Sequence, residues 1–86
     1  MYLHLGSDTV VNTANIISIM DMESSSYSKH SKEFLKIAEE EGFIRTVSDE
    51  IPKTFIICEE NGQSVIYLTN ISTKALAGRI RKSEID

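Results

Sequence analysis

The segment from residue 71 to residue 83 carries four cations and no acid, a pattern that favours one kind of chemistry. The cations are Lys74, Arg79, Arg81 and Lys82. Such side chains contact phosphate groups and release counterions, and each contact changes log K by about 0.9 for a tenfold change in salt. The segment is therefore a candidate phosphate-binding surface. The alternative is a solvated basic helix end that complements the helix dipole.

The net charge of the whole chain is −4 at pH 7, which by itself argues against a nucleic-acid partner. The charge is unevenly distributed, because residues 1–43 contain three lysines against seven aspartate or glutamate residues. A small basic patch binds weakly alone, but identical patches repeated in an oligomer act through their effective concentration. We therefore expect any DNA binding to depend on assembly.

The sequence contains no catalytic or metal-binding motif. It has no Gly-rich phosphate loop, no cysteine pair at metal spacing and no H-E-x-x-H pattern. The run Glu39–Glu41 cannot converge on one ion, because consecutive helical side chains diverge by about 100°. Cys58 is predicted to be a buried apolar residue within a strand, and His4 a core or interface residue. We expect a protein that is not an enzyme and has no metal, cofactor or small-molecule substrate.

Length and composition indicate a single domain spanning residues 1–86. Of the 86 residues, 41% are hydrophobic and 26% are charged, as in an ordinary globular domain. The opening MYLHLGSD lacks the basic start and apolar core of a signal peptide. No apolar run approaches the roughly 20 residues that span a bilayer. We expect a cytoplasmic protein without membrane contact.

A β-hairpin at Asn61-Gly62 is the element that the sequence constrains most strongly. Two β-branched runs meet at these residues, which readily take the positive φ of a type I′ turn. A two-residue turn also sets the register of the strands. The predicted pairs are Glu60 with Gln63, Cys58 with Val65, Ile57 with Ile66, Ile56 with Tyr67 and Phe55 with Leu68.

Both faces of this hairpin are apolar, since successive side chains of a strand point to opposite faces. One face carries Phe55, Ile57, Ile66 and Leu68, and the other carries Ile56, Cys58, Val65 and Tyr67. Two short helices can cover one face of a small sheet and leave the second without a partner. We therefore predict a homo-oligomer whose interface is the second face.

The remaining elements are short. Apolar alternation and turn residues predict strands at Tyr2–Leu5, Thr9–Val11, Ile16–Met20 and Phe43–Val47. The strand Ile16–Met20 is nearly all apolar, which is typical of burial on both faces. Five or six short strands and two helices predict an α+β fold with a small, mainly antiparallel sheet.

Two helices are predicted. The first has about ten residues, begins at a Ser31 cap with Glu33 in its first turn, and ends before Gly42. Its apolar side consists of Phe34, Leu35, Ile37 and Ala38. The second runs from about Thr73 to Arg81 after a cap at Asn70 or Ser72. Its buried stripe consists of Leu76, Ala77 and Ile80. Residues 22–30 include four serines and are expected to form a loop.

These segments together resemble the extracellular matrix regulator family, and most closely its RemB branch. The resemblance lies in the opening MYLHLGSDTVVNTANIISIMDME, in KEFLKIAEEEGFI, in Pro52–Ile57, and in Tyr67–Ser72 with the basic helix that follows. It implies a small cytoplasmic regulator of biofilm matrix gene expression in Gram-positive, spore-forming bacteria. For the sister RemA branch it implies a homo-oligomeric, DNA-binding transcription regulator.

One stretch departs from the RemA branch. RemA-type sequences carry an arginine-rich segment just before the hairpin, where this chain has DEIPK over residues 49–53. The DNA-binding candidates here are therefore Lys74, Arg79, Arg81 and Lys82, with Lys53 as a lesser contributor. Two hypotheses remain: a homo-oligomer that binds double-stranded DNA, or an oligomeric protein-interaction module of the same pathway that does not.

Overall fold

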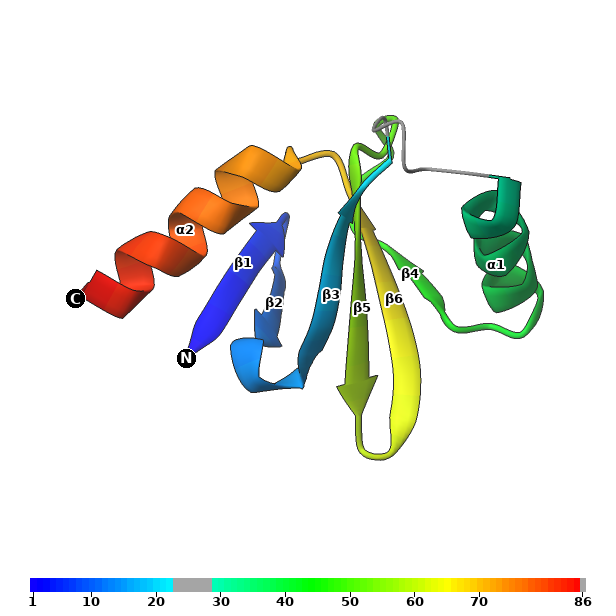
Figure 1. Cartoon of the computed structure of the whole chain (residues 1–86), viewed down its shortest axis with the longest axis horizontal. Coiled ribbons are helices and arrows are strands. Elements are labelled where there is room, and N and C mark those ends of the chain that lie inside the picture. Colours follow the sequence, from blue (N-terminus) through cyan, green and yellow to red (C-terminus); the bar gives the residue numbers. More distant parts are fainter. Residues whose placement is uncertain (23–28, 86) are drawn as a thin grey trace.

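Figure 1 shows an α+β fold in which a four-stranded sheet lies between two helices. The computed structural model describes residues 1–22 and 29–85, with side chains for residues 1–22 and 31–81. In these residues the strands are β1 (Tyr2–Gly6), β2 (Thr9–Asn12), β3 (Ile16–Asp21), β4 (Ile44–Thr46), β5 (Thr54–Glu60) and β6 (Gln63–Thr69). The α-helices are α1 (Lys29–Glu40) and α2 (Thr73–Ile85), and Thr13–Asn15 forms a short 3₁₀ turn, η1.

The strands form two sheets where the sequence predicted one. Strands β1 and β2 pair with each other, and the larger sheet has the order β3-β5-β6-β4. Strand β4 runs parallel to β6, while the other pairs are antiparallel. The α+β class, the mainly antiparallel pairing and the described total of six strands with two α-helices agree with the prediction.

The hairpin of β5 and β6 has the predicted turn and register. Asn61 and Gly62 have φ angles of 53° and 79°, as a type I′ turn requires. All five predicted pairs are present, from Glu60–Gln63 to Phe55–Leu68. The turn is local, so the two residues that make it suffice to place the strands.

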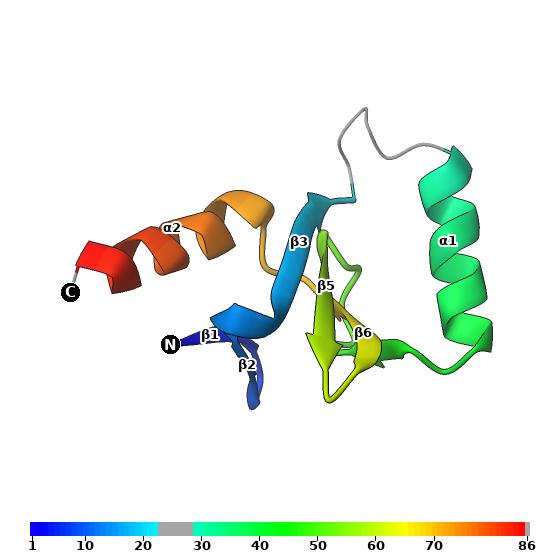
Figure 2. The ribbon, with the colours of Figure 1, turned by 60° about the horizontal axis from the view of Figure 1, so that its bottom comes forward.

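Both faces of the large sheet are covered within the single chain (Figure 2). The β1–β2 hairpin and α2 lie over one face, where Leu3, Leu5, Val11 and Leu76 form a core with Ile56 and Cys58. Helix α1 lies over the other face, where Leu35 and Ala38 pack with Phe55 and Ile66. The premise that one face of the hairpin lacks a partner in its own chain is therefore wrong.

Two buried threonine hydroxyls join the four-stranded sheet to β1 and to the segment that leads into α2. Thr69 Oγ1 donates a 2.6 Å hydrogen bond to the main-chain oxygen of Leu5 and accepts one of 3.2 Å from the Ile71 N–H. Thr54 Oγ1 donates a 2.8 Å bond to the Ile71 oxygen. These bonds fix β1 and the start of α2 against the sheet, because buried polar groups are costly when they lack partners.

Helix α1 differs from the prediction at its start and on its surface. It begins at Lys29, so Ser31 lies inside the helix and Glu33 falls outside the first turn. Most of the predicted serine loop, residues 23–28, lies outside the described residues. Phe34 and Ile37 are 45% and 59% exposed, because α1 presents only one edge of its apolar side to the sheet.

The C-terminal end of α1 follows the prediction. Gly42 has a φ of 80°, and its N–H donates to the Glu39 oxygen. The Phe43 N–H donates to the Ala38 oxygen at 2.9 Å, which completes a Schellman motif. The motif turns the chain sharply from α1 toward β4.

Strand β3 is an edge strand and not a strand buried on both faces. A register irregularity between Ile16 and Ser18 leaves Ile17 61% exposed. Ile16 and Ile19 pack on the core below the β1–β2 hairpin, and Met20 packs on the α1 side. The apolar run therefore serves two cores at the sheet edge.

Candidate nucleic-acid interface

Helix α2 holds most of the predicted phosphate contacts. Ser72 caps it, with its Oγ accepting a 3.1 Å hydrogen bond from the Ala75 N–H. Leu76 is fully buried and Ile80 is partly buried against the core, whereas Ala77, which was predicted to be buried, is exposed. The apolar stripe is therefore narrow, and the rest of the helix surface faces solvent.

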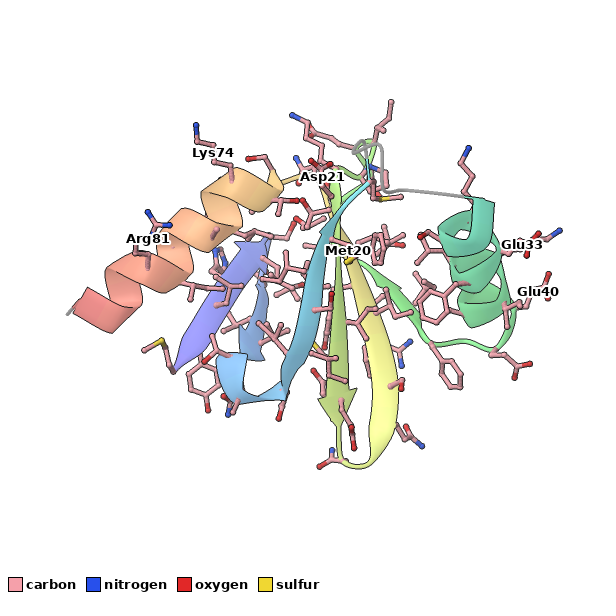
Figure 3. All side chains as sticks on the ribbon, viewed as in Figure 1. Met20, Asp21, Glu33, Glu40, Lys74 and Arg81 are labelled. Carbon is pink, nitrogen blue, oxygen red and sulfur yellow. The ribbon has the colours of Figure 1, made fainter. Side chains whose placement is uncertain are left out.

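Lys74 and Arg81 lie on the same side of α2. They are seven residues apart, which places them within about 20° around the helix and about 10 Å along it. Figure 3 shows both side chains extending away from the sheets, and both are exposed. Among the described side chains neither has a hydrogen-bonding or ionic partner. We call these two residues the α2 basic pair.

Arg79 does not join this pair. Its guanidinium donates a 2.7 Å hydrogen bond to the main-chain oxygen of His4 in β1. About 140° separates Arg79 from Lys74 around the helix. His4 itself is exposed rather than a core residue, and its Nε2 lies 2.9 Å from the Ser7 oxygen. Arg79 thus connects α2 to β1.

Lys53 lies close to the start of α2 but among acids. Its neighbour Thr54 has its Oγ1 3.0 Å from the Thr73 hydroxyl, and Lys53 is exposed. The acids are Asp21, which pairs with Thr54 across β3 and β5, and Glu50, which accepts a hydrogen bond from Asn70. These acids partly offset the positive charge of Lys53 near the start of α2. The side chain of the fifth candidate, Lys82, lies outside the described residues.

The four candidates for an oligomer interface are not a free surface. Ile56 and Cys58 are 0% exposed and Val65 is 8% exposed, so a second copy could reach them only by displacing β1–β2 and α2. Tyr67 is half-buried and donates a 2.9 Å hydrogen bond to Glu60 Oε2. Burial and this bond raise the pKa of Tyr67 to about 12.

The thiol of Cys58 is free and buried. Burial, and then the negative charge of Glu60, raises the pKa of the Cys58 thiol to about 11, which keeps it protonated and unreactive at neutral pH. Within residues 1–22 and 29–85, no group of three or more histidine, cysteine, aspartate or glutamate side chains could hold a metal ion. In the same part of the chain, no helix is long and apolar enough to cross a membrane.

Comparison with known proteins gives the family. The model of the RemA-like family, described as extracellular matrix regulatory protein A-like, matches residues 2–80. No curated protein sequence matches the chain. The family match covers all the described strands, α1 and the part of α2 that carries Lys74 and Arg79. The chain therefore belongs to the RemA-like family of extracellular matrix regulatory proteins.

Proposed function

We propose that this protein regulates extracellular matrix genes from the cytoplasm as a non-catalytic homo-oligomer that binds double-stranded DNA through α2. The observation that carries the proposal is the α2 basic pair, two exposed cations on one side of a helix without a described carboxylate partner. Family membership supports the regulatory role. Within the family we assign the chain to the RemB branch, because its opening, the segment KEFLKIAEEEGFI and the strands of its hairpin resemble that branch.

The small number of phosphate contacts in one copy favours assembly. Two or three contacts in one copy would give a slope of only about −2 to −3 in log K against log salt, which means weak binding. A dimer with two such surfaces on one duplex gains from effective concentration. An exposed apolar surface suited to self-contact lies on the outer face of β1–β2, where Tyr2 and Val10 are 68% and 51% exposed.

The test is a mobility-shift titration of duplex DNA from about 50 to 200 mM salt. We expect the double variant Lys74→Ala/Arg81→Ala to bind more weakly and with a flatter salt slope. The control, Lys32→Ala/Lys36→Ala on α1, removes the same charge elsewhere and should bind as the parent does. Absence of any shift by the parent at about 50 mM salt would refute DNA binding.

The oligomer is tested separately by light scattering at micromolar concentration. We expect a mass that is a multiple of 9.7 kDa, the mass of one chain. The variant Val10→Lys should lower that mass if the outer face of β1–β2 forms the contact. A monomeric parent would refute assembly.

A further inference from the structure

A small apolar groove lies between α1 and the four-stranded sheet, on the face of the sheet opposite α2. Its volume is about 210 Å³, and its lining includes Phe34, Ile37, Ala38, Phe43, Ile57 and Ser64. We call it the α1 groove. It is smaller than the roughly 300–1,000 Å³ of sites for drug-sized ligands, which suits one or two side chains of a peptide better than a small molecule.

The large side chains of the α1 groove are unusually accessible. Ile37 is 59% exposed, Phe34 is 45% exposed and Phe43 is 42% exposed. Their positions are fixed by regular structure, since Phe34 and Ile37 are one turn apart on α1 and the Schellman motif holds Phe43. Adjoining exposed apolar side chains of this size mark interaction surfaces.

Four exposed carboxylates lie near the α1 groove, two of them on the outer side of its helix. Glu33, Glu40 and Glu41 are the helical neighbours of Ile37 at positions i−4, i+3 and i+4. On the sheet, Glu59 lies opposite Ser64 in the lining. Figure 3 shows Glu33 and Glu40 on the side of α1 that faces away from the sheet. We call these four residues the acidic rim.

The described lysines of α1 lie on the side of the helix away from the groove, where Lys36 is the helical neighbour of Glu33 and Glu40 and partly offsets their charge. Lys32 and Lys36 are about 60° and 100° from Leu35 around α1, on the flank opposite to Phe34. Arg45 comes near the end of α1 and donates a 2.9 Å hydrogen bond to the Gly42 oxygen. Its charge also acts on Tyr67, on the other face of the sheet. The groove therefore presents apolar side chains with negative charge around them.

We propose that the α1 groove binds a basic amphipathic helix of a partner protein. An apolar anchor of that helix would fill the groove, and flanking lysines or arginines would pair with the acidic rim. Amphipathic helices bind grooves in this way, with apolar anchor residues at positions i, i+3, i+4 and i+7. This inference does not depend on DNA binding by α2.

A second copy of this chain fits the α1 groove less well. Its cationic helix, α2, already buries Leu76 and part of Ile80 in its own core. Its most exposed apolar residue in the described chain, Ile51 at 85%, follows Asp49 and Glu50, which the acidic rim would repel. Charge complementarity therefore favours a different, basic partner.

The test measures binding of a model peptide to the full chain by isothermal titration calorimetry. The probe is a helical peptide with leucines at i, i+3, i+4 and i+7 and lysines elsewhere. The control is a peptide of the same composition in scrambled order. We expect the patterned peptide to bind more tightly. The variant Ile37→Ser should weaken binding about tenfold or more, as loss of a central anchor does. The control Ile51→Ser, equally apolar but away from the groove, should bind as the parent does.

A second variant guards against a folding artefact. Glu40→Gln/Glu41→Gln leaves the apolar lining intact and should weaken binding several-fold while flattening its salt dependence. Equal binding of the patterned peptide by the parent and Ile37→Ser would overturn the proposal. A second outcome would also overturn it. If the parent binds no peptide and Ile37→Ser has a lower molar mass than the parent by light scattering, the groove is a contact between copies of this chain.

Discussion

Arg79 on α2 donates a 2.7 Å hydrogen bond to the main-chain oxygen of His4 on β1, 75 residues away in sequence. This bond joins the basic helix to the β1–β2 hairpin, beside the buried contacts of Leu76. It also separates Arg79 in role from Lys74 and Arg81, whose side chains extend freely to solvent. Three cations of one helix therefore divide into one structural residue and two candidate phosphate contacts.

Replacing Arg79 should affect stability more than the other two replacements do. We expect Arg79→Ala to lower the free energy of unfolding by about 1 kcal/mol, since a charged donor to a main-chain oxygen is lost. Lys74→Ala and Arg81→Ala should each change it by less than about 0.5 kcal/mol. Urea denaturation measures all three, and equal small effects would contradict the structural role of Arg79.

The hydroxyl of Thr69 should contribute strongly to the join between β1, β6 and α2. Thr69→Val preserves the shape of the side chain but leaves the Leu5 oxygen without its donor and the Ile71 N–H without its acceptor. We expect a loss of about 1–3 kcal/mol by urea denaturation. The control Thr46→Val, at an exposed position of β4, should be nearly neutral, and a similar loss in both would refute the argument.

Two glycines should respond to alanine in opposite directions. Gly62 has a φ of 79°, and a Cβ there would contact nothing within 4 Å, so the cost of Gly62→Ala is backbone strain of about 1–2 kcal/mol. Gly78 lies in α2 with the same open surroundings. We expect Gly78→Ala to stabilise the protein by about 0.5–1 kcal/mol. Thermal unfolding distinguishes the two variants. Destabilisation by Gly78→Ala would contradict a helical conformation at residue 78.

The Tyr67–Glu60 bond predicts a loss of stability at alkaline pH. The pKa of Tyr67 rises from 10.0 to about 12 in the folded protein, so the folded state holds the phenol proton more tightly than the unfolded state. Its contribution to stability is complete below about pH 10 and is lost as the pH approaches about 12. Tyr67→Phe should therefore lose less stability than the parent over this range.

Urea denaturation at a series of pH values measures the difference. Cys58 titrates in both proteins, so comparing them isolates the phenol. The control Tyr2→Phe, at a position 68% exposed, should follow the parent. Parallel pH profiles for the parent and Tyr67→Phe would show that the folded and unfolded phenols titrate alike.

Sequence reasoning located the elements well where their signals are local. Ser72 caps α2 and Gly42 ends α1 because a single side chain or a single positive φ decides each boundary. It failed at the start of α1, where Ser31 resembles a cap but the helix begins at Lys29. Burial was harder to predict. Phe34 and Leu35 are both apolar, but Leu35 faces the sheet and is buried, whereas Phe34 is exposed.

The sequence by itself determined the β5–β6 hairpin, because Asn61-Gly62 fixes the turn and the turn fixes every pair along the two strands. Only the tertiary structure decided what covers its two faces. Ile56 and Cys58 are buried by α2, which follows β6 directly, and by β1 and β2, which lie at the other end of the chain. Alternation within a strand shows that a face is apolar, but the identity of its cover depends on long-range packing that no local pattern encodes. The same packing turned Arg79 toward His4 and left Lys74 and Arg81 facing solvent.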